Sequence, residues 1–124
     1  MEKEFVPYEL AVKLKALGFD EECLSYYFNK QLSFGSKTSY GEVVEAPLYQ
    51  QAFRWFREKH QIVCVIDFYN DGDLWEDTIY TVTISEFEHF KSHDSFVQFE
   101  YKTYEDAELA CLRKLIEIVK NKQI

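Results

Sequence analysis

The fold is decided by the apolar stretches Ile62-Val63-Cys64-Val65-Ile66-Asp67-Phe68-Tyr69 and Thr78-Ile79-Tyr80-Thr81-Val82-Thr83-Ile84-Ser85, and by the turn sequence Asn70-Asp71-Gly72-Asp73 between them. Both stretches are rich in β-branched and aromatic residues, which pack well on a pleated sheet. Asn, Asp and Gly tolerate the backbone angles of tight hairpin turns. The pattern therefore predicts two antiparallel strands, and residues 96–101 are predicted to form a third.

Upstream of these strands, a second hairpin is predicted over residues 24–34. Its apolar residues alternate on both sides of Asn29-Lys30, and Asn accepts the positive φ that a two-residue turn requires. Val43-Val44 is predicted to add a short strand after the loop that follows this hairpin.

Three helices are predicted around the strands. The first covers residues 7–17, with Pro7 in its opening turn and Gly18 as a left-handed stop. The second is predicted to open at Pro47 and to run to about Lys59. The third follows the capping-box-like pair Thr103 and Asp106 and carries a buried stripe to about Lys120.

The element order is helix, hairpin, helix, three strands, helix. It predicts an α+β fold: one largely antiparallel sheet of three to five strands with helices packed on one face. A chain of 124 residues with 18% aromatic residues can bury a single sizeable core. We therefore expect residues 1–124 to form one domain.

The negative charge is concentrated in residues 67–108. This region holds two bases, Lys91 and Lys102, against twelve acids: Asp67, Asp71, Asp73, Glu76, Asp77, Glu86, Glu88, Asp94, Glu100, Glu105, Asp106 and Glu108. The whole chain carries a formal net charge of −8. Such a field repels nucleic acid and phospholipid surfaces and attracts a basic partner. We therefore expect the chain to bind neither nucleic acid nor a membrane.

Several features predict a cytoplasmic protein. The N-terminus Met1-Glu2-Lys3-Glu4-Phe5 lacks a signal-peptide pattern, and no stretch approaches the eighteen or so apolar residues that a membrane-spanning helix needs. The three cysteines Cys23, Cys64 and Cys111 are odd in number and widely spaced. That spacing predicts reduced thiols rather than a disulfide framework.

The second helix supplies one group of candidate binding residues: Arg54, Trp55 and Arg57. Its apolar residues occupy more than one face, so we expect one side to cover the sheet and the other to meet either the N-terminal helix or a second subunit. In the second case Trp55 would anchor a homodimer, since aromatic residues with flanking arginine are enriched at interfaces.

The turn between the first two strands supplies the other candidates: Asp71, Asp73, Trp75, Glu76 and Asp77. The acids do not match the spacing of a calcium-binding loop, so turn-forming and edge-protecting roles explain them better. A further hypothesis is that the acids of residues 67–108 imitate the phosphates of a nucleic acid.

No pattern indicates an enzyme, a metal or a cofactor. His89 and His93 are four residues apart, which suits zinc on a helix, but they lie between predicted strands and lack a third ligand. Cys, Ser, His and acidic residues are all present, yet their spacing assembles no nucleophile with a base. We predict no catalytic residue, no metal ligand and no cofactor.

The order helix, three strands, helix over residues 47–120 resembles that of the double-stranded-RNA-binding domain. In that family the start of the last helix presents lysines to phosphates. Here the same place reads Tyr104-Glu105-Asp106-Ala107-Glu108. The inverted charge argues against RNA binding through this surface.

Three segments carry a second resemblance: residues 5–10 (Phe5-Val6-Pro7-Tyr8-Glu9-Leu10), 46–59 from Ala46 to Lys59, and 104–117 from Tyr104 to Glu117. They look like small uncharacterised proteins of Bacteroides-type bacteria and their phages or prophages. The resemblance carries over no activity or site residue. It implies a genomic context in which short accessory proteins commonly bind host or viral components.

These observations predict a non-enzymatic acidic accessory protein that is phage- or mobile-element-associated and acts through protein–protein interaction. The main alternative is a pocket protein that holds a small ligand, with Trp55, Trp75 or a Tyr as a stacking wall and Arg54 or Arg57 for an anion. A monomer with an enclosed pocket would favour the second, and an exposed aromatic patch the first.

Overall fold

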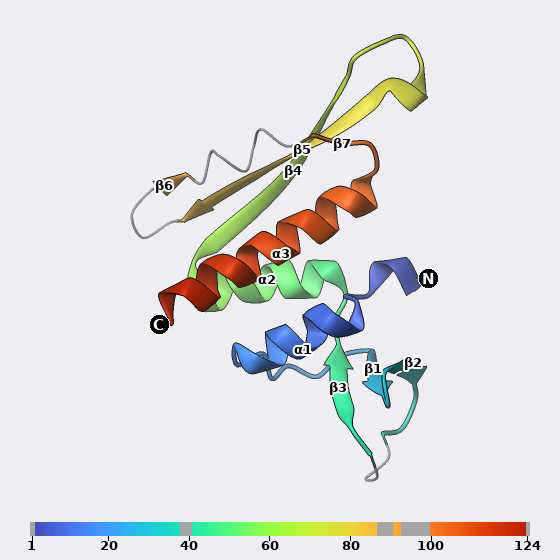
Figure 1. Cartoon of the computed structure of the whole chain (residues 1–124), viewed down its shortest axis with the longest axis vertical. Coiled ribbons are helices and arrows are strands. Elements are labelled where there is room, and N and C mark those ends of the chain that lie inside the picture. The colour runs from blue at the N-terminus through green and yellow to red at the C-terminus, as the bar shows by residue number, and fades with distance from the viewer. Residues whose placement is uncertain (1, 38–40, 87–90, 93–99, 124) are drawn as a thin grey trace.

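The computed structural model describes residues 2–37, 41–86, 91–92 and 100–123 (Figure 1). It is an α+β protein, as predicted. In chain order the elements are η1 (Glu2–Glu4), α1 (Tyr8–Ala16), β1 (Ser25–Phe28), β2 (Gln31–Phe34), β3 (Val43–Ala46), α2 (Tyr49–His60), β4 (Ile62–Asn70), η2 (Trp75–Asp77), β5 (Thr78–Glu86), β6 (Lys91–Ser92), β7 (Glu100–Tyr101) and α3 (Tyr104–Lys122).

The described strands form two antiparallel sheets, and the prediction of one sheet is wrong on this point. The first sheet has the order β2-β1-β3. In the second, β5 lies between β4 and the short strands β6 and β7, both of which pair with β5. The reason is that α2 follows β3 almost directly, so the chain enters the helix layer before the second sheet begins (Figure 1).

The hairpin β1–β2 turns at Asn29-Lys30, as predicted, with Ser25 opposite Phe34. Asn29 has a φ of 50° and Lys30 a φ of 71°. Two consecutive left-handed residues match the twist of the flanking strands, which explains why so short a turn suffices. The short strand predicted around Val43 is confirmed as β3, on the other side of β1.

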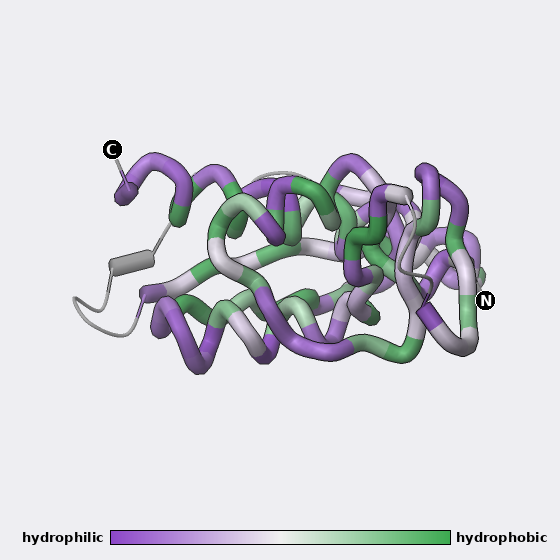
Figure 2. The backbone as a smooth tube through the Cα atoms, turned by 90° about the horizontal axis from the view of Figure 1, so that it is seen from below, coloured by the Kyte–Doolittle hydropathy of each residue, from purple (hydrophilic) through white to green (hydrophobic). Residues whose placement is uncertain are grey.

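The helices cover one face of the β4–β5 hairpin, with α2 against β4 and α3 against β5 (Figure 1). The core between them contains the fully buried Phe56, Ile62, Val82, Ile84 and Leu115. In Figure 2 the outward turns of the helices are mainly hydrophilic, and hydrophobic segments face the interior. The packing of helices on one face, expected from the pattern, is thus present for this sheet.

Two predicted helix starts need a small correction. Pro7 is the N-cap residue of α1 and Pro47 precedes the N-cap Leu48 of α2, so neither proline is the first helical residue. Phe5 forms a bridge with Leu48, and the Val6 N–H donates to the Pro47 carbonyl at 2.9 Å. These bonds hold both segments extended, which delays the helices. In α3 the Asp106 N–H donates to Thr103 Oγ1 at 3.1 Å, as predicted.

The cysteine prediction is wrong for one pair. Cys64 and Cys111 are joined as a disulfide that links β4 to α3, with their Cα atoms 6.8 Å apart. Cys64 lies on the helix-facing side of its strand opposite Ile84, and Cys111 lies in the buried stripe of α3, so packing brings the thiols together. Cys23 is a free thiol.

The third predicted strand, 96–101, is present as β7 at residues 100–101, and residues 96–99 lie outside the described part of the chain. His89 and His93 lie outside it as well. Among the described residues, no helix is both long and apolar enough to cross a membrane.

Candidate functional site

The turn between β4 and β5 projects beyond the ends of the helices (Figure 1). It carries the second group of predicted binding residues: Asp71, Asp73, Trp75, Glu76 and Asp77. The two strands pair residue by residue from Ile62 with Glu86 to Asn70 with Thr78, so the ladder supports the turn up to its base. The structure therefore brings these candidates together at one end of the sheet.

Hydrogen bonds within the turn fix its shape. The Gly72 N–H donates to Asn70 Oδ1 at 2.9 Å, and Asn70 Nδ2 donates to the Leu74 carbonyl at 2.8 Å. The Asp71 N–H donates to the Asp77 carbonyl at 3.0 Å. Asp77 Oδ2 accepts from the Leu74 N–H at 3.2 Å, and the Asp77 N–H donates to the Leu74 carbonyl at 3.0 Å.

Gly72 is required by the packing of this turn. A Cβ built on Gly72 would lie 2.7 Å from Cγ of Asp77, far inside van der Waals contact. The carboxylate of Asp77 thus occupies the space that a side chain at position 72 would need. Asp77, which the sequence placed among the binding candidates, has a structural role inside the turn.

The turn exposes two large apolar side chains. Trp75 is 77% exposed and Leu74 is 62% exposed. Neither is close to the core. Asp71, Asp73 and Glu76 beside them are exposed acids. We call the set Asp71, Asp73, Leu74, Trp75 and Glu76 the tip surface.

Three aromatic rings lie side by side across the helix-facing side of the sheet, near the end that carries the tip surface. The centroids of Phe68 and Tyr80 are 6.5 Å apart, and those of Tyr80 and Tyr104 are 5.8 Å apart. Phe68 is 65% exposed although it lies on the helix-facing side of β4, opposite Tyr80. Apolar area near the tip is therefore larger than Trp75 alone provides.

The acidic region of the sequence is divided in space. Glu86, at the far end of β5 from the tip, is buried and pairs with Lys122 Nζ at 3.0 Å. Glu100 accepts a hydrogen bond from the Tyr69 hydroxyl at 2.6 Å. Among the described acids, Asp71, Asp73 and Glu76 are exposed beside the exposed apolar residues Leu74 and Trp75, which makes them candidates for binding.

Glu108 is a buried acid on α3. Burial and the nearby charge of Glu105 together raise its pKa to about 7, against a hydrogen bond with Gln50 that lowers it. It faces the start of α2, where it also contributes to the raised pKa of Tyr49. Within the described part of the chain, Glu108 belongs to no group of three His, Cys, Asp or Glu side chains that could hold a metal ion, and we consider its effect on stability.

The first group of candidates is divided by α2. Trp55 is 3% exposed and its ring packs on Phe19, with centroids 5.5 Å apart. We expected this side of the helix to meet either the N-terminal helix or a second subunit. The structure shows a contact within the chain, because Phe19 belongs to the segment that follows the N-terminal helix. Trp55 has almost no surface left for a second subunit.

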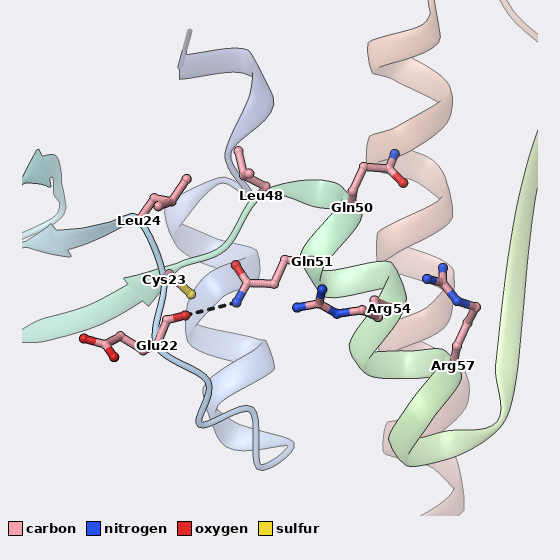
Figure 3. A pocket seen from close by; sticks show the side chains of 8 residues that line it. All are labelled: Glu22, Cys23, Leu24, Leu48, Gln50, Gln51, Arg54 and Arg57. Atoms are coloured by element: carbon pink, nitrogen blue, oxygen red, sulfur yellow. Dashed lines mark hydrogen bonds between the residues drawn. The ribbon is translucent and has the colours of Figure 1, made fainter.

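Arg54 and Arg57 lie on the opposite face of α2, beside an open groove of about 740 Å³ (Figure 3). The groove wall across from the helix is formed by Glu22, Cys23 and Leu24. Arg54 lies 3.8 Å from Glu21, so part of its charge is already balanced. The expected stacking wall is absent from this lining, since Trp55 points into the core and Trp75 is at the tip.

Sequence reasoning singled out Trp75 but missed Leu74 and Phe68, which read as ordinary strand and turn residues. Their signal is positional: an apolar residue beyond the reach of the covering helices faces water.

Within the described residues, no group of three His, Cys, Asp or Glu side chains is placed to hold a metal ion. No protein family, curated protein or solved structure matches the chain.

Proposed function

We propose that this chain is a non-enzymatic, acidic binding protein that docks onto a basic protein surface through the tip surface. The observation that carries the proposal is Trp75, 77% exposed on a turn whose shape is fixed by hydrogen bonds. A rigid aromatic side chain loses little freedom on binding, so most of its burial contributes to affinity. Tryptophan is also enriched among residues that dominate interfaces.

The surroundings of Trp75 indicate the chemistry of the partner. Leu74 supplies adjacent apolar area, and Asp71, Asp73 and Glu76 surround it with negative charge. A complementary surface has an apolar pocket bordered by Lys or Arg. Such charge pairs accelerate encounter and choose among partners, and their effect falls as salt rises.

The wider role we propose is that of an accessory protein associated with a phage or other mobile element, acting in the cytoplasm. The resemblance of residues 5–10, 46–59 and 104–117 to proteins of Bacteroides-type bacteria and their phages supports this context. The partner is then a host or viral protein, and neither nucleic acid nor a membrane.

The test is recovery of partners from a lysate of the native host on immobilised protein, quantified by mass spectrometry. Trp75→Ala and the triple variant Asp71→Asn, Asp73→Asn, Glu76→Gln should each lose the same partner. Leu24→Ala is the matched control, because Leu24 is 73% exposed but lies beside α2. The partner should be basic, and its recovery should fall with salt.

Equal recovery on the wild type and on Trp75→Ala would refute the tip surface as the docking site. A recovered partner that binds duplex DNA offers an added test of the imitation of phosphates. In that case DNA should compete with the wild type for the partner, and the triple variant should not compete with DNA.

A second candidate function is supported by the groove beside α2, where Arg54 and Arg57 line one side (Figure 3). Two arginines in an acidic protein suit a small anion carrying a carboxylate or phosphate. Inorganic phosphate and citrate should then raise the melting temperature of the wild type but not that of Arg54→Gln/Arg57→Gln. Equal shifts in both proteins would exclude this function.

A further inference from the structure

Strand β4 has one unpaired edge among the described residues. It pairs along its whole length with β5, whereas β6 and β7 lie on the far side of β5. Its nine residues make it long for an edge strand. Within the described residues, this edge therefore carries backbone groups that are not bonded to a neighbouring strand.

The hydrogen bond from the Asp71 N–H to the Asp77 carbonyl shows which residues face this edge. It continues the β4–β5 ladder by one step, and in an antiparallel ladder every second residue bonds to the neighbour. The odd-numbered residues of β4 thus bond to β5. The groups that face the open edge belong to Ile62, Cys64, Ile66, Phe68 and Asn70.

The Phe68 N–H agrees with this assignment, because it donates to the side chain of the preceding Asp67 at 2.8 Å instead of to β5. Edge strands of monomers are commonly protected by lysine, proline or a bulge. β4 contains neither lysine nor proline, and its unbroken pairing with β5 leaves no bulge. Asp67 is its one charged residue.

We propose that a second copy of this chain pairs with the open edge, β4 against β4, antiparallel and centred on Ile66. In this register Ile62 lies opposite Asn70 of the second copy and Cys64 lies opposite Phe68. Both members of each pair present their N–H and carbonyl groups to the edge, so the ladder continues across a twofold axis. The result is one continuous sheet shared by two chains.

Side chains and charges fit the same register. On the face of the sheet away from the helices, Val63 meets Tyr69 of the second copy and Val65 meets Asp67, so the two Asp67 carboxylates do not face each other. Val65, which is 52% exposed, gains a neighbouring strand on its open side. Asp67 is the one charged residue that β4 contributes to this face.

The charges at the strand ends are complementary. Beyond Asn70 the chain continues into the acidic turn, level with the end of α2 in the second copy. The last turn of α2 holds Arg57 and Lys59 with Glu58 between them, and α3 ends with Lys120. Negative and positive ends therefore meet twice around the twofold axis.

This dimer goes beyond the proposed function and does not depend on it, because Trp75 takes no part in the strand pairing. Light scattering of the full chain tests it over micromolar to millimolar concentrations. We expect the mass to rise from 14.8 kDa toward twice that value. A mass of 14.8 kDa over the whole range would overturn the proposal.

Opposite charges at position 65 test the register. Val65→Asp places a carboxylate against Asp67 of the second copy at two symmetric sites, whereas Val65→Lys places an ammonium there. With cross-strand pairs of this kind, the dissociation constant should rise about threefold to thirtyfold for the first variant and fall for the second. A shift of both variants in the same direction would contradict this register.

Amide hydrogen exchange covers the case in which a variant is too unstable to compare. In the wild type, the Ile66 and Phe68 N–H groups should become protected as concentration rises, while the Val65 N–H, bonded within the chain, should not change. Protection of Ile66 that is independent of concentration would overturn the dimer.

Discussion

Asp77 holds Leu74 through two hydrogen bonds: its Oδ2 accepts from the Leu74 N–H at 3.2 Å, and its own N–H donates to the Leu74 carbonyl at 3.0 Å. Trp75 lies between the two residues in the chain. The backbone on both sides of Trp75 is thus held by hydrogen bonds between its neighbours. The exposed tryptophan is therefore carried on a backbone of defined shape.

Asp77→Ala should loosen the tip. The variant loses one acceptor at the start of η2, and loss of a comparable helix cap costs about 0.5–2 kcal/mol. We expect the free energy of unfolding to fall by about 1 kcal/mol in urea titrations. Asp77→Asn keeps an acceptor oxygen and should lie closer to the wild type. Equal losses for both variants would show that the hydrogen bond to Leu74 is unimportant.

Leu115→Ala should strongly destabilise the protein. Leu115 is fully buried between α3 and the sheet, and removing its methyl groups leaves a cavity. The expected loss is about 2–5 kcal/mol of the free energy of unfolding. Arg113→Ala is the control, because its ion pair with Glu9 is exposed and worth at most about 1 kcal/mol. Similar losses in both variants would contradict the packing described here.

The sequence predicted the elements whose signals are local. The Asn29-Lys30 turn, the Thr103 cap and the strands on either side of Gly72 are each specified by neighbouring residues, and all are present. The division into two sheets depends on which distant strands pair. That choice follows from the direction α2 takes after β3, and no short pattern encodes it.

Stability should depend on the protonation of Glu108. Its folded pKa is raised to about 7 from the usual value of 4.5, so the folded protein keeps a proton that the unfolded chain releases. The stabilisation is complete below pH 4.5 and is lost as the pH rises to about 7. Glu108→Gln should therefore gain about 1–3 kcal/mol over the wild type above that window.

The control for this prediction is Glu117→Gln on the same helix, whose side chain is 59% exposed and pairs with Lys114. It should leave the pH profile of urea unfolding unchanged. A wild-type profile that matches that of Glu108→Gln from acid to neutral pH would contradict the burial of this carboxyl.

The Cys64–Cys111 bond should stabilise the oxidised protein. It closes a loop with a sequence separation of 47, and a crosslink of this span restricts the unfolded chain by about 2–4 kcal/mol. A phosphine reductant should lower the urea midpoint of the wild type accordingly, and Cys23→Ser should respond in the same way. Three titratable thiols in the unfolded, non-reduced protein would refute the bond.

The candidate site was predictable in part. The sequence placed both Trp55 and Trp75 among the binding candidates, with either as a stacking wall and Trp55 alone as the anchor of a homodimer. Their fates differ for a tertiary reason: Phe19 covers Trp55, whereas β4 and β5 carry Trp75 beyond the helices. How far a hairpin extends past its covering layer depends on the lengths of separate elements, which local patterns do not compare.

We expect Trp75 to anchor the protein partner. The most direct test is calorimetric titration of the basic partner, once recovered, into the wild type, Trp75→Ala and the control Leu24→Ala. An anchoring side chain costs about 2 kcal/mol or more when truncated, so Trp75→Ala should weaken the dissociation constant by about thirtyfold or more. Leu24→Ala should bind as the wild type does. A Trp75→Ala titration that overlays the wild-type curve would contradict the account.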